Sequence, residues 1–552
     1  MTGVTATGSN SGAAFPPVPA ALTASIVYFT VAACYLRFFV LPDVPILPSG
    51  DAIGFVDDGA RIVAGQLPYR DFFEIVPPGT PLVYAALIRI FGWFNWIPLA
   101  AMTGLAGATV LLMTLAASRV MRWNAVALPA LLLSGFILLE SADATHHWFS
   151  TVWVLAGMLA LFDKITFPRI LAAGVFCGLA ACFTQSKGAT AVAGFVTYLW
   201  WKSWRENGSA AQRWRRCLTL CGAAVAVFGA VNLYFVRAAG FGRWFYCLVV
   251  YPVRFYSAPA VNNWRVILFD FQWHRGAAAW IAFPFVYLTV PLVYIVFLFA
   301  MRRRWRKDRD RPWDQLLLVA LTGIAMFLAI ATSPSVKRLS SASPPAMILL
   351  AWFFDRPGRT ASALRAGLGM AAVALAMIPA IRTQTRQLAK LDLPAGRTAI
   401  SPLIYEEYSW LLSHTHPGQF FWGAPLNLPF HLRNPAAIEG IDASEYTRPE
   451  DVAALVQALQ QHQVPMMILP SEEKYPLTVG RPANHLGPFV EYLHANYQLI
   501  RTFANGDEVW EKLEDMGNVP SARTFPTFYF PLQDSPPREN FMPSRNMNGS
   551  EG

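Results

Sequence analysis

Carboxylates cluster in one segment, residues 42–96, which lies between two long apolar runs. From the stretch LPSGD onward this segment contains five of them, Asp51, Asp57, Asp58, Asp71 and Glu74. A carboxylate placed beside a hydroxyl group can remove its proton while a new bond forms, which is general-base catalysis. Residues of the same type also cap helices, and Asp57 or Asp58 has the position for this role. On residue type alone, both interpretations stay open.

Polar residues gather again around the short stretch SADATHHW, where Glu140, Asp143, His146 and His147 lie close together. Histidine is a common metal ligand. Adjacent histidines seldom share one ion, however, and Trp148 is typical of a membrane interface. We therefore expect a polar interfacial cap here, and the sequence predicts neither a metal site nor a cofactor.

Three basic residues lie near the ends of apolar runs. The stretch FTQSKGAT contains Lys187, and KRLSSASPP begins with Lys337 and Arg338. Such residues often extend along a helix end to reach water. On the outer face of a membrane, which basic residues avoid, they call for an anionic partner. Arg243 and Arg254 are weaker candidates of the same kind.

The elements that carry these residues are membrane helices. Of the 552 residues, 55% are hydrophobic and 14% are charged, and the mean hydropathy is +0.36. A soluble domain has about 25% charged residues, so a soluble protein is excluded. Runs of roughly 20 apolar residues span a bilayer as helices. The sequence predicts eleven spans, at residues 22–41, 97–118, 124–140, 148–163, 170–186, 188–201, 217–236, 277–300, 313–331, 340–354 and 364–381.

Basic residues decide the orientation of these spans. The apolar segment 79–94 is short and contains Arg89, so we expect it to lie along the interface. The basic stretches 202–216 and 302–311, with five and seven Lys and Arg residues, then face the cytoplasm. The net charge of +10 thus reflects membrane topology, and nucleic acid is not an expected partner.

The chain divides into four predicted parts. Residues 1–21 form a disordered cytoplasmic tail, and residues 22–385 form the membrane domain, with 42–96 as its large external loop. Residues 386–515 form an extracytoplasmic α/β domain, because the amphipathic pattern DVAALVQALQQHQ precedes the strand-like VPMMILP. Residues 516–552 form a second disordered tail.

The segment 42–96 resembles the first external loop of GT-C superfamily glycosyltransferases, which use lipid-phosphate sugars. The likeness is closest to bacterial relatives of protein O-mannosyltransferases and to the lipid A aminoarabinose transferase. In that family an acidic residue precedes a glycine by about fourteen positions, as Asp51 precedes Gly65 here. A Pro-Tyr-Arg-Asp-like stretch, a Pro-Pro pair and an apolar helix ending in Phe-Gly follow, and PYRDFF, Pro77-Pro78 and Phe91-Gly92 match them.

One position departs from the family pattern, because many relatives have Asp-Glu where this chain has Asp51-Ala52. Asp57 and Asp58 form an acidic pair, but they lie only eight and seven positions before Gly65. Asp51 is therefore favoured as the catalytic acid, and Asp57 and Asp58 stay as alternatives.

The resemblance implies an all-α membrane domain of the GT-C type in a bacterial inner membrane. It implies an inverting transfer of a sugar from a polyprenyl-phosphate donor to a hydroxyl group of an envelope acceptor. Asp51 would act as the general base. Lys187, Lys337 and Arg338 would stabilise the departing lipid phosphate. The remaining predicted substrate-binding residues are Asp71, Glu74, His146, His147 and Arg254.

Two alternatives belong to other classes. A transporter or flippase would place ionisable residues near the middle of its spans and would show repeats between its halves. A non-catalytic partner in envelope assembly would work through the C-terminal domain. Convergence of the acids of segment 42–96 with Lys187 and Arg338 on one cavity would favour the enzyme.

Overall fold

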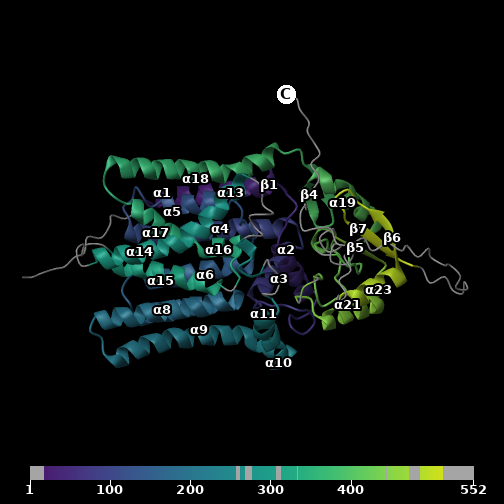
Figure 1. Cartoon of the computed structure of the whole chain (residues 1–552), viewed down its shortest axis with the longest axis horizontal. Helices are drawn as coiled ribbons and strands as arrows, with labels where there is room; N and C mark the ends of the chain where they lie inside the picture. The colour runs from purple at the N-terminus through teal and green to yellow at the C-terminus, as the bar shows by residue number, and fades with distance from the viewer. Residues whose placement is uncertain are drawn as a thin grey trace, which may run out of the picture. The chain divides into compact units, whose positions relative to one another are not determined.

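Every predicted span falls on one or more helices of the computed structural model (Figure 1). The structure describes residues 18–256, 262–267, 277–305, 312–331, 333–423, 425–442, 444, 446–470 and 485–513. Most of the first predicted tail, all of the second, and the end of the basic stretch 302–311 lie outside these residues. The helices are α1 (Ala20–Phe38), α4 (Trp96–Val120), α5 (Leu128–Leu132) with the π-helical turn η1 (Leu133–Ile137), α6 (His146–Ala160), α7 (Phe167–Phe183), α8 (Gln185–Arg205), α9 (Ala210–Ala239), α13 (Ala277–Pro284) with η4 (Phe285–Thr289) and α14 (Val290–Arg304), α15 (Trp313–Ala329), α16 (Val336–Ala342), α17 (Pro344–Phe354) and α18 (Arg359–Thr385).

Among the described residues, five helical stretches are long and apolar enough to span a membrane by length and composition. They are α1, α4, α9, Trp280–Arg304 and α18. Shorter apolar helices, including α7, α15 and α17, accompany them. The chain is thus a mostly helical protein with several apolar helices, and the number of eleven spans stays a prediction.

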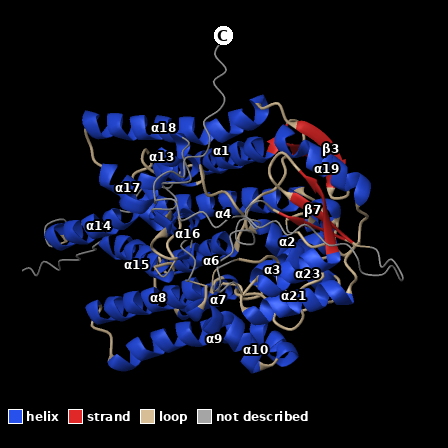
Figure 2. Cartoon of the chain, turned by 45° about the vertical axis from the view of Figure 1, so that its right-hand side comes forward, coloured by secondary structure: helices blue, strands red, loops and turns tan. Residues whose placement is uncertain are grey.

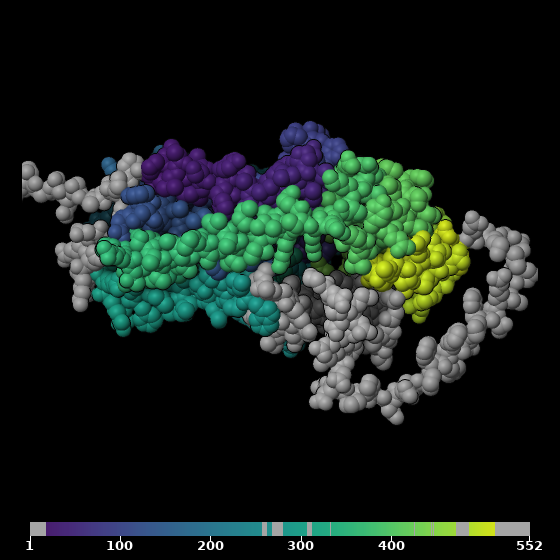
Figure 3. Space-filling model, turned by 90° about the horizontal axis from the view of Figure 1, so that it is seen from above, coloured from purple at the N-terminus to yellow at the C-terminus, as the bar shows by residue number. Residues whose placement is uncertain are grey.

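Small residues allow these helices to approach one another closely. On α7, Gly174 and Gly178 face α9, and a methyl group at either position would lie within 2.6 Å of a backbone carbonyl of α9. Small residues four positions apart permit such contacts between membrane helices. Elsewhere α1 packs against both α4 and α18, and Figure 3 shows α18 running alongside the N-terminal helix.

The segment 42–96 folds into two packed helices, α2 (Ala52–Val63) and α3 (Gly79–Phe91). The strands β1 (Phe39–Val40) and β2 (Val44–Pro45) form a short antiparallel pair before α2. Pro77 and Pro78 precede α3, where proline is tolerated because the first helical N–H groups have no intrahelical acceptor. The expected helix at 79–94 is therefore present, and its place along a membrane interface stays a prediction.

The C-terminal part combines helices and strands (Figure 2). A hairpin of β3 (Ala389–Leu393) and β4 (Gly396–Ile400) precedes α19 (Pro402–His414) and α20 (Asn427–Phe430). The predicted helix and strand are present as α21 (Pro449–Gln461) and β5 (Met466–Leu469). After α23 (Gly487–Asn496), the strands β6 (Tyr497–Thr502) and β7 (Glu508–Lys512) complete an antiparallel sheet in the order β5-β7-β6.

Two hydrophobic clusters, separate from that of the apolar helices, fill the C-terminal part. The chain up to Lys512 nevertheless forms one compact unit. A second unit begins at Leu513, the last residue that the structure describes. The predicted boundary at residue 386, and the side of the membrane on which this part lies, stay predictions.

Candidate active site

A cavity of about 1260 Å³ lies between segment 42–96, the apolar helices and the C-terminal part. Ligand pockets commonly measure about 300–1,000 Å³, so this cavity has room for two substrate groups. Seven of the predicted site residues line it, namely Asp51, Asp57, Asp58, Glu74, His146, His147 and Arg338. Four do not line it, namely Asp71, Lys187, Arg254 and Lys337.

Asp51 stands at the start of α2 with its carboxylate free of any capping bond. Asp143 performs the capping instead, because its carboxylate accepts the backbone N–H groups of Asp51 and Ala52 at 3.0 and 3.3 Å. Gly50 makes this approach possible, since its φ of +89° suits glycine and a side chain there would collide with Asp143. Lys337 Nζ lies 3.8 Å from Asp51 Oδ1.

The pKa of Asp143 is raised to about 6, because burial and, second, the nearby Asp51 carboxylate raise it, while Lys337 opposes the shift. Asp51 itself is largely exposed, so its carboxylate is available to a ligand at the edge of the cavity. The interpretation of Asp57 or Asp58 as a helix cap is wrong, because both lie inside α2, which begins earlier than the sequence suggested.

Four carboxylates, which we call the acid wall, converge on the cavity: Asp57, Asp58, Glu74 and Glu439. Asp57 accepts a hydrogen bond of 3.2 Å from Asn427 Nδ2. Glu74 accepts the backbone N–H groups of Ile75 and Val76 at 2.6 and 3.0 Å. Asp58 and Glu74 also share a hydrogen bond.

The pKa values of all four carboxyl groups of the acid wall are raised above their ordinary values. Burial raises the pKa of Asp57 to about 6, although Arg61 opposes the shift. Burial and the neighbouring Glu74 and Glu439 hold the pKa of Asp58 well above its ordinary value. Glu439 is open to the cavity but enclosed by protein, and this burial, with repulsion from Asp57 and Glu74, raises its pKa to about 8. Burial and mutual repulsion therefore disfavour the fully charged form of the wall, in which all four carboxyl groups are ionised.

Arg338 faces the acid wall's cavity from α16. Its Nη1 donates to the carbonyl of Ser333 at 3.1 Å and to the Ser333 hydroxyl, and its Nη2 donates to Asn262 Oδ1 at 2.9 Å and to the Tyr256 hydroxyl. All these acceptors are neutral, and no carboxylate among the described residues pairs with the guanidinium. Arginine has five N–H donors, so one donor and the full positive charge remain for an anionic ligand.

Lys187 does not contact the cavity, which corrects the expectation that it binds a phosphate directly. Its side chain is fully buried, and its ammonium donates to the His147 carbonyl at 2.8 Å, Thr151 Oγ1 at 3.0 Å and Ser341 Oγ at 2.7 Å. An ammonium has three donors, so none is left for a ligand. Because Ser341 also donates to the Arg338 carbonyl at 2.7 Å, Lys187 links α6 and α8 to the helix that carries Arg338.

His146 and His147 both line the cavity. Their ring centroids are 3.9 Å apart, and the Nδ1 atom of each ring is buried without a hydrogen bond. Phe55 packs its ring edge against His146 at 5.3 Å. No group of three metal-ligating side chains occurs in the described part of the chain, and contact of the two histidines with a substrate stays a prediction.

Asp71 and Arg254 lie away from the cavity, and the geometry does not support their predicted contacts with substrate. Asp71 pairs with Arg70, with N–O distances of 2.7 and 2.9 Å, and accepts the Leu67 N–H at 2.8 Å. It thereby closes the turn of the PYRD stretch, and the Arg70 hydrogen bond lowers its pKa. Arg254 is exposed at the end of α11 (Tyr251–Arg254), which follows α10 (Phe241–Phe245) and η2 (Tyr246–Val250).

Glu439 and Asn427 are among the cavity residues that escaped sequence reasoning. Both come from the C-terminal part, and 370 positions separate Asn427 from its partner Asp57. No local motif marks either residue. Asn427 Nδ2 donates to Asp57, and Asn427 Oδ1 is buried without a hydrogen-bond partner.

Solved structures show which fold surrounds this cavity. ArnT from Cupriavidus metallidurans, bound to undecaprenyl phosphate, superposes with a TM-score of 0.55 at 14% sequence identity, covering 91% of this chain and 99% of that one. The apo state of the same protein superposes with a TM-score of 0.56 at 16% sequence identity, covering 89% of this chain and 98% of that one. The chain has the GT-C fold. No protein-family model matches the sequence, and no curated protein matches it in sequence.

The GT-C likeness extends over nearly the whole of both chains. The expectation of a GT-C resemblance, drawn from segment 42–96, is thus confirmed at the level of the fold.

Proposed function

We propose that this chain is an integral-membrane glycosyltransferase that moves a sugar from a polyprenyl-phosphate donor to the hydroxyl group of an envelope acceptor. The observation that carries the proposal is the shared cavity, which joins Asp51 and the acid wall to Arg338, an arginine that no carboxylate of the described residues pairs with. A transporter would instead need a polar pathway through the spans. The undecaprenyl phosphate bound to ArnT, a protein of the same fold, supports a lipid-phosphate donor.

The residues suggest how the reaction proceeds. The acceptor oxygen attacks the anomeric carbon, the bond from this carbon to the phosphate oxygen breaks, and the lipid phosphate leaves with the electron pair. Asp51 takes the acceptor proton as general base. Arg338 and the nearby Lys337 stabilise the charge on the leaving phosphate. The acid wall accepts hydrogen bonds from sugar hydroxyl groups, because neutral and charged carboxyl oxygens are both acceptors.

The proposed topology follows from the basic residues. The N-terminus and the turn between α8 and α9 face the cytoplasm, and eleven spans cross a bacterial inner membrane. Segment 42–96 and the C-terminal part then lie outside, where the donor enters the cavity from the bilayer.

The test is to incubate the purified chain with a panel of polyprenyl-phosphate sugars and envelope lipid extract, and to measure the polyprenyl phosphate released. We expect at least one donor to be consumed, and Asp51→Asn to stop its use. Asp71→Asn is the matched control, because it makes the same substitution in the same segment outside the cavity. Failure of every donor would count against the proposal. Near-normal turnover by Asp51→Asn would move the general-base role to Asp57 or Asp58, and near-normal turnover by all three Asn variants would count against the proposal.

A further inference from the structure

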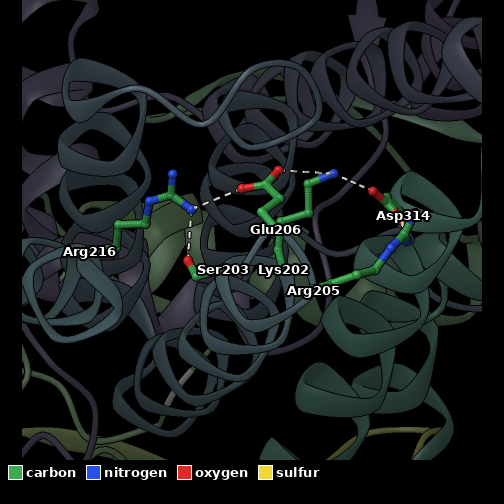
Figure 4. A network of polar contacts seen from close by, with 6 residues as sticks. All are labelled: Lys202, Ser203, Arg205, Glu206, Arg216 and Asp314. Atoms are coloured by element: carbon green, nitrogen blue, oxygen red, sulfur yellow. Dashed lines mark hydrogen bonds and ion pairs between the residues drawn. The ribbon is translucent and has the colours of Figure 1, made fainter. Parts of the chain in front are cut away.

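The turn between α8 and α9 joins basic groups to carboxylates in a network of three helices (Figure 4). Lys202 and Arg205, at the end of α8, both pair with Asp314 at the start of α15. Glu206 lies 3.6 Å from Lys202 and accepts a hydrogen bond of 3.4 Å from Arg216 of α9. Asp314 and Glu206 are therefore both already paired with basic side chains, which are Lys202, Arg205 and Arg216.

Two further arginines of α9 stay outside the network. Arg213 and Arg215 have no carboxylate partner in the part of the chain that the structure describes. The Arg213 guanidinium lies 5.5 Å from the centre of the Trp200 ring, and its Nε is buried without a hydrogen-bond acceptor. Arg215 is exposed. Glu206 and Asp314 already form ion pairs with other basic residues. The two arginines therefore leave an excess of positive charge at the start of α9.

Tryptophans surround this charge. Trp200, Trp204 and Trp214 are all exposed, and the rings of Trp200 and Trp214 meet edge to face at 5.2 Å. Tryptophan concentrates where lipid headgroups meet water. One turn further along α9, Leu218 is exposed as well, as expected of a residue that faces acyl chains.

We propose that one surface, which we call the α8–α9 patch, binds the headgroup of an anionic phospholipid in the cytoplasmic leaflet. The patch consists of Arg213, Arg215, Trp200, Trp204 and Trp214. The guanidinium groups of the partly exposed Arg213 and the exposed Arg215 donate to the lipid phosphate, and the indole rings contact the glycerol and upper acyl region. This inference rests on the membrane orientation given under the proposed function, but it requires no sugar transfer. Anionic lipid attracts such basic groups near a membrane surface.

The test uses the purified full chain in detergent and counts bound lipids by native mass spectrometry, with phosphatidylglycerol and phosphatidylcholine titrated separately. We expect phosphatidylglycerol to bind more tightly. Arg213→Gln combined with Arg215→Gln should weaken its binding roughly 5- to 30-fold, since each charge near the surface contributes about fivefold. Arg356→Gln combined with Arg359→Gln is the control, because both arginines are exposed on the same predicted face without being part of the patch.

Equal binding of the two lipids, or equal losses in the patch variant and the control variant, would overturn the proposal. Displacement of the bound lipid by an equal concentration of inorganic phosphate would overturn the assignment to a lipid. An unchanged melting temperature in the patch variant, with the Asp314 network intact, separates lost binding from unfolding. Because the readout is lipid binding, its failure leaves the glycosyltransferase proposal in place, and failure of donor turnover leaves the lipid site in place.

Discussion

Replacing Asp57 with asparagine should stabilise the protein at alkaline pH. The Asp57 side chain is only 5% exposed, and its pKa is raised from 3.8 to about 6 by burial. Asparagine has nearly the same shape, carries no charge, and keeps an oxygen that accepts the hydrogen bond from Asn427. The substitution therefore removes the cost of a buried charge while retaining the packing of α2.

The pKa shift gives both the sign and the size of the effect. A carboxyl group with a raised pKa binds its proton more tightly in the folded state than in the unfolded state. Its contribution to stability is complete below about pH 4 and is lost as the pH rises through 6. Two pKa units correspond to about 3 kcal/mol. With an unfolding entropy of about 2.1 cal/mol/K per residue, this shifts the melting temperature by roughly 2–3 °C.

The assay is thermal unfolding of the detergent-purified protein between pH 4 and pH 8. Asp57→Asn should match the wild type at pH 4 and exceed it at pH 8. Asp71→Asn is the control with the opposite sign, because its Arg70 hydrogen bond lowers the pKa of this carboxyl and the charged form is favoured. The reasoning is refuted if Asp57→Asn melts at or below the wild-type temperature at pH 8, or if its gain is the same at both pH values.

Three further predictions concern transfer and topology. Asp51→Asn should lower turnover about 10²- to 10⁴-fold in a donor-consumption assay, the usual size of general-base catalysis, and near-normal turnover would move the role to Asp57 or Asp58. Arg338→Gln should lower donor consumption roughly 10- to 150-fold, since a charge-assisted hydrogen bond contributes about 1.5–3 kcal/mol. An unchanged dependence on donor concentration, at the wild-type melting temperature, would exclude a phosphate contact. A cysteine at position 208, between α8 and α9, should resist labelling from outside intact cells, and labelling there would reverse the orientation.

The helices could be predicted well because their signal is local. A run of about 20 apolar residues leaves the backbone no alternative to a helix in lipid, and each predicted run is helical. The limits of α8 extend beyond the predicted 188–201 in both directions, because helices continue past the bilayer into polar residues such as Lys202 and Arg205. Apolar length thus sets the position of each element but not where it ends.

The site could be predicted only in part, because its contacts join distant segments. The acids of segment 42–96 were visible as a cluster, yet their partners Asn427 and Glu439 come from the C-terminal part. The cap of α2 was assigned to the wrong residues for the same reason. Its acceptor is Asp143, 92 positions after Asp51, and no local pattern around α2 shows it.

Lys187 and Arg338 show why residue type and membrane side do not suffice to identify a phosphate ligand. Both are basic, both lie near the predicted outer ends of spans, and neither pairs with a carboxylate among the described residues. The two residues differ in their hydrogen-bond partners. Every N–H donor of the buried Lys187 ammonium is already bonded to a neutral oxygen. Arg338 keeps a free donor and borders the cavity. The two are also coupled, since Ser341 accepts from Lys187 and donates to the Arg338 carbonyl. Lys187 can therefore affect the proposed phosphate binding indirectly, by fixing the helix that carries Arg338.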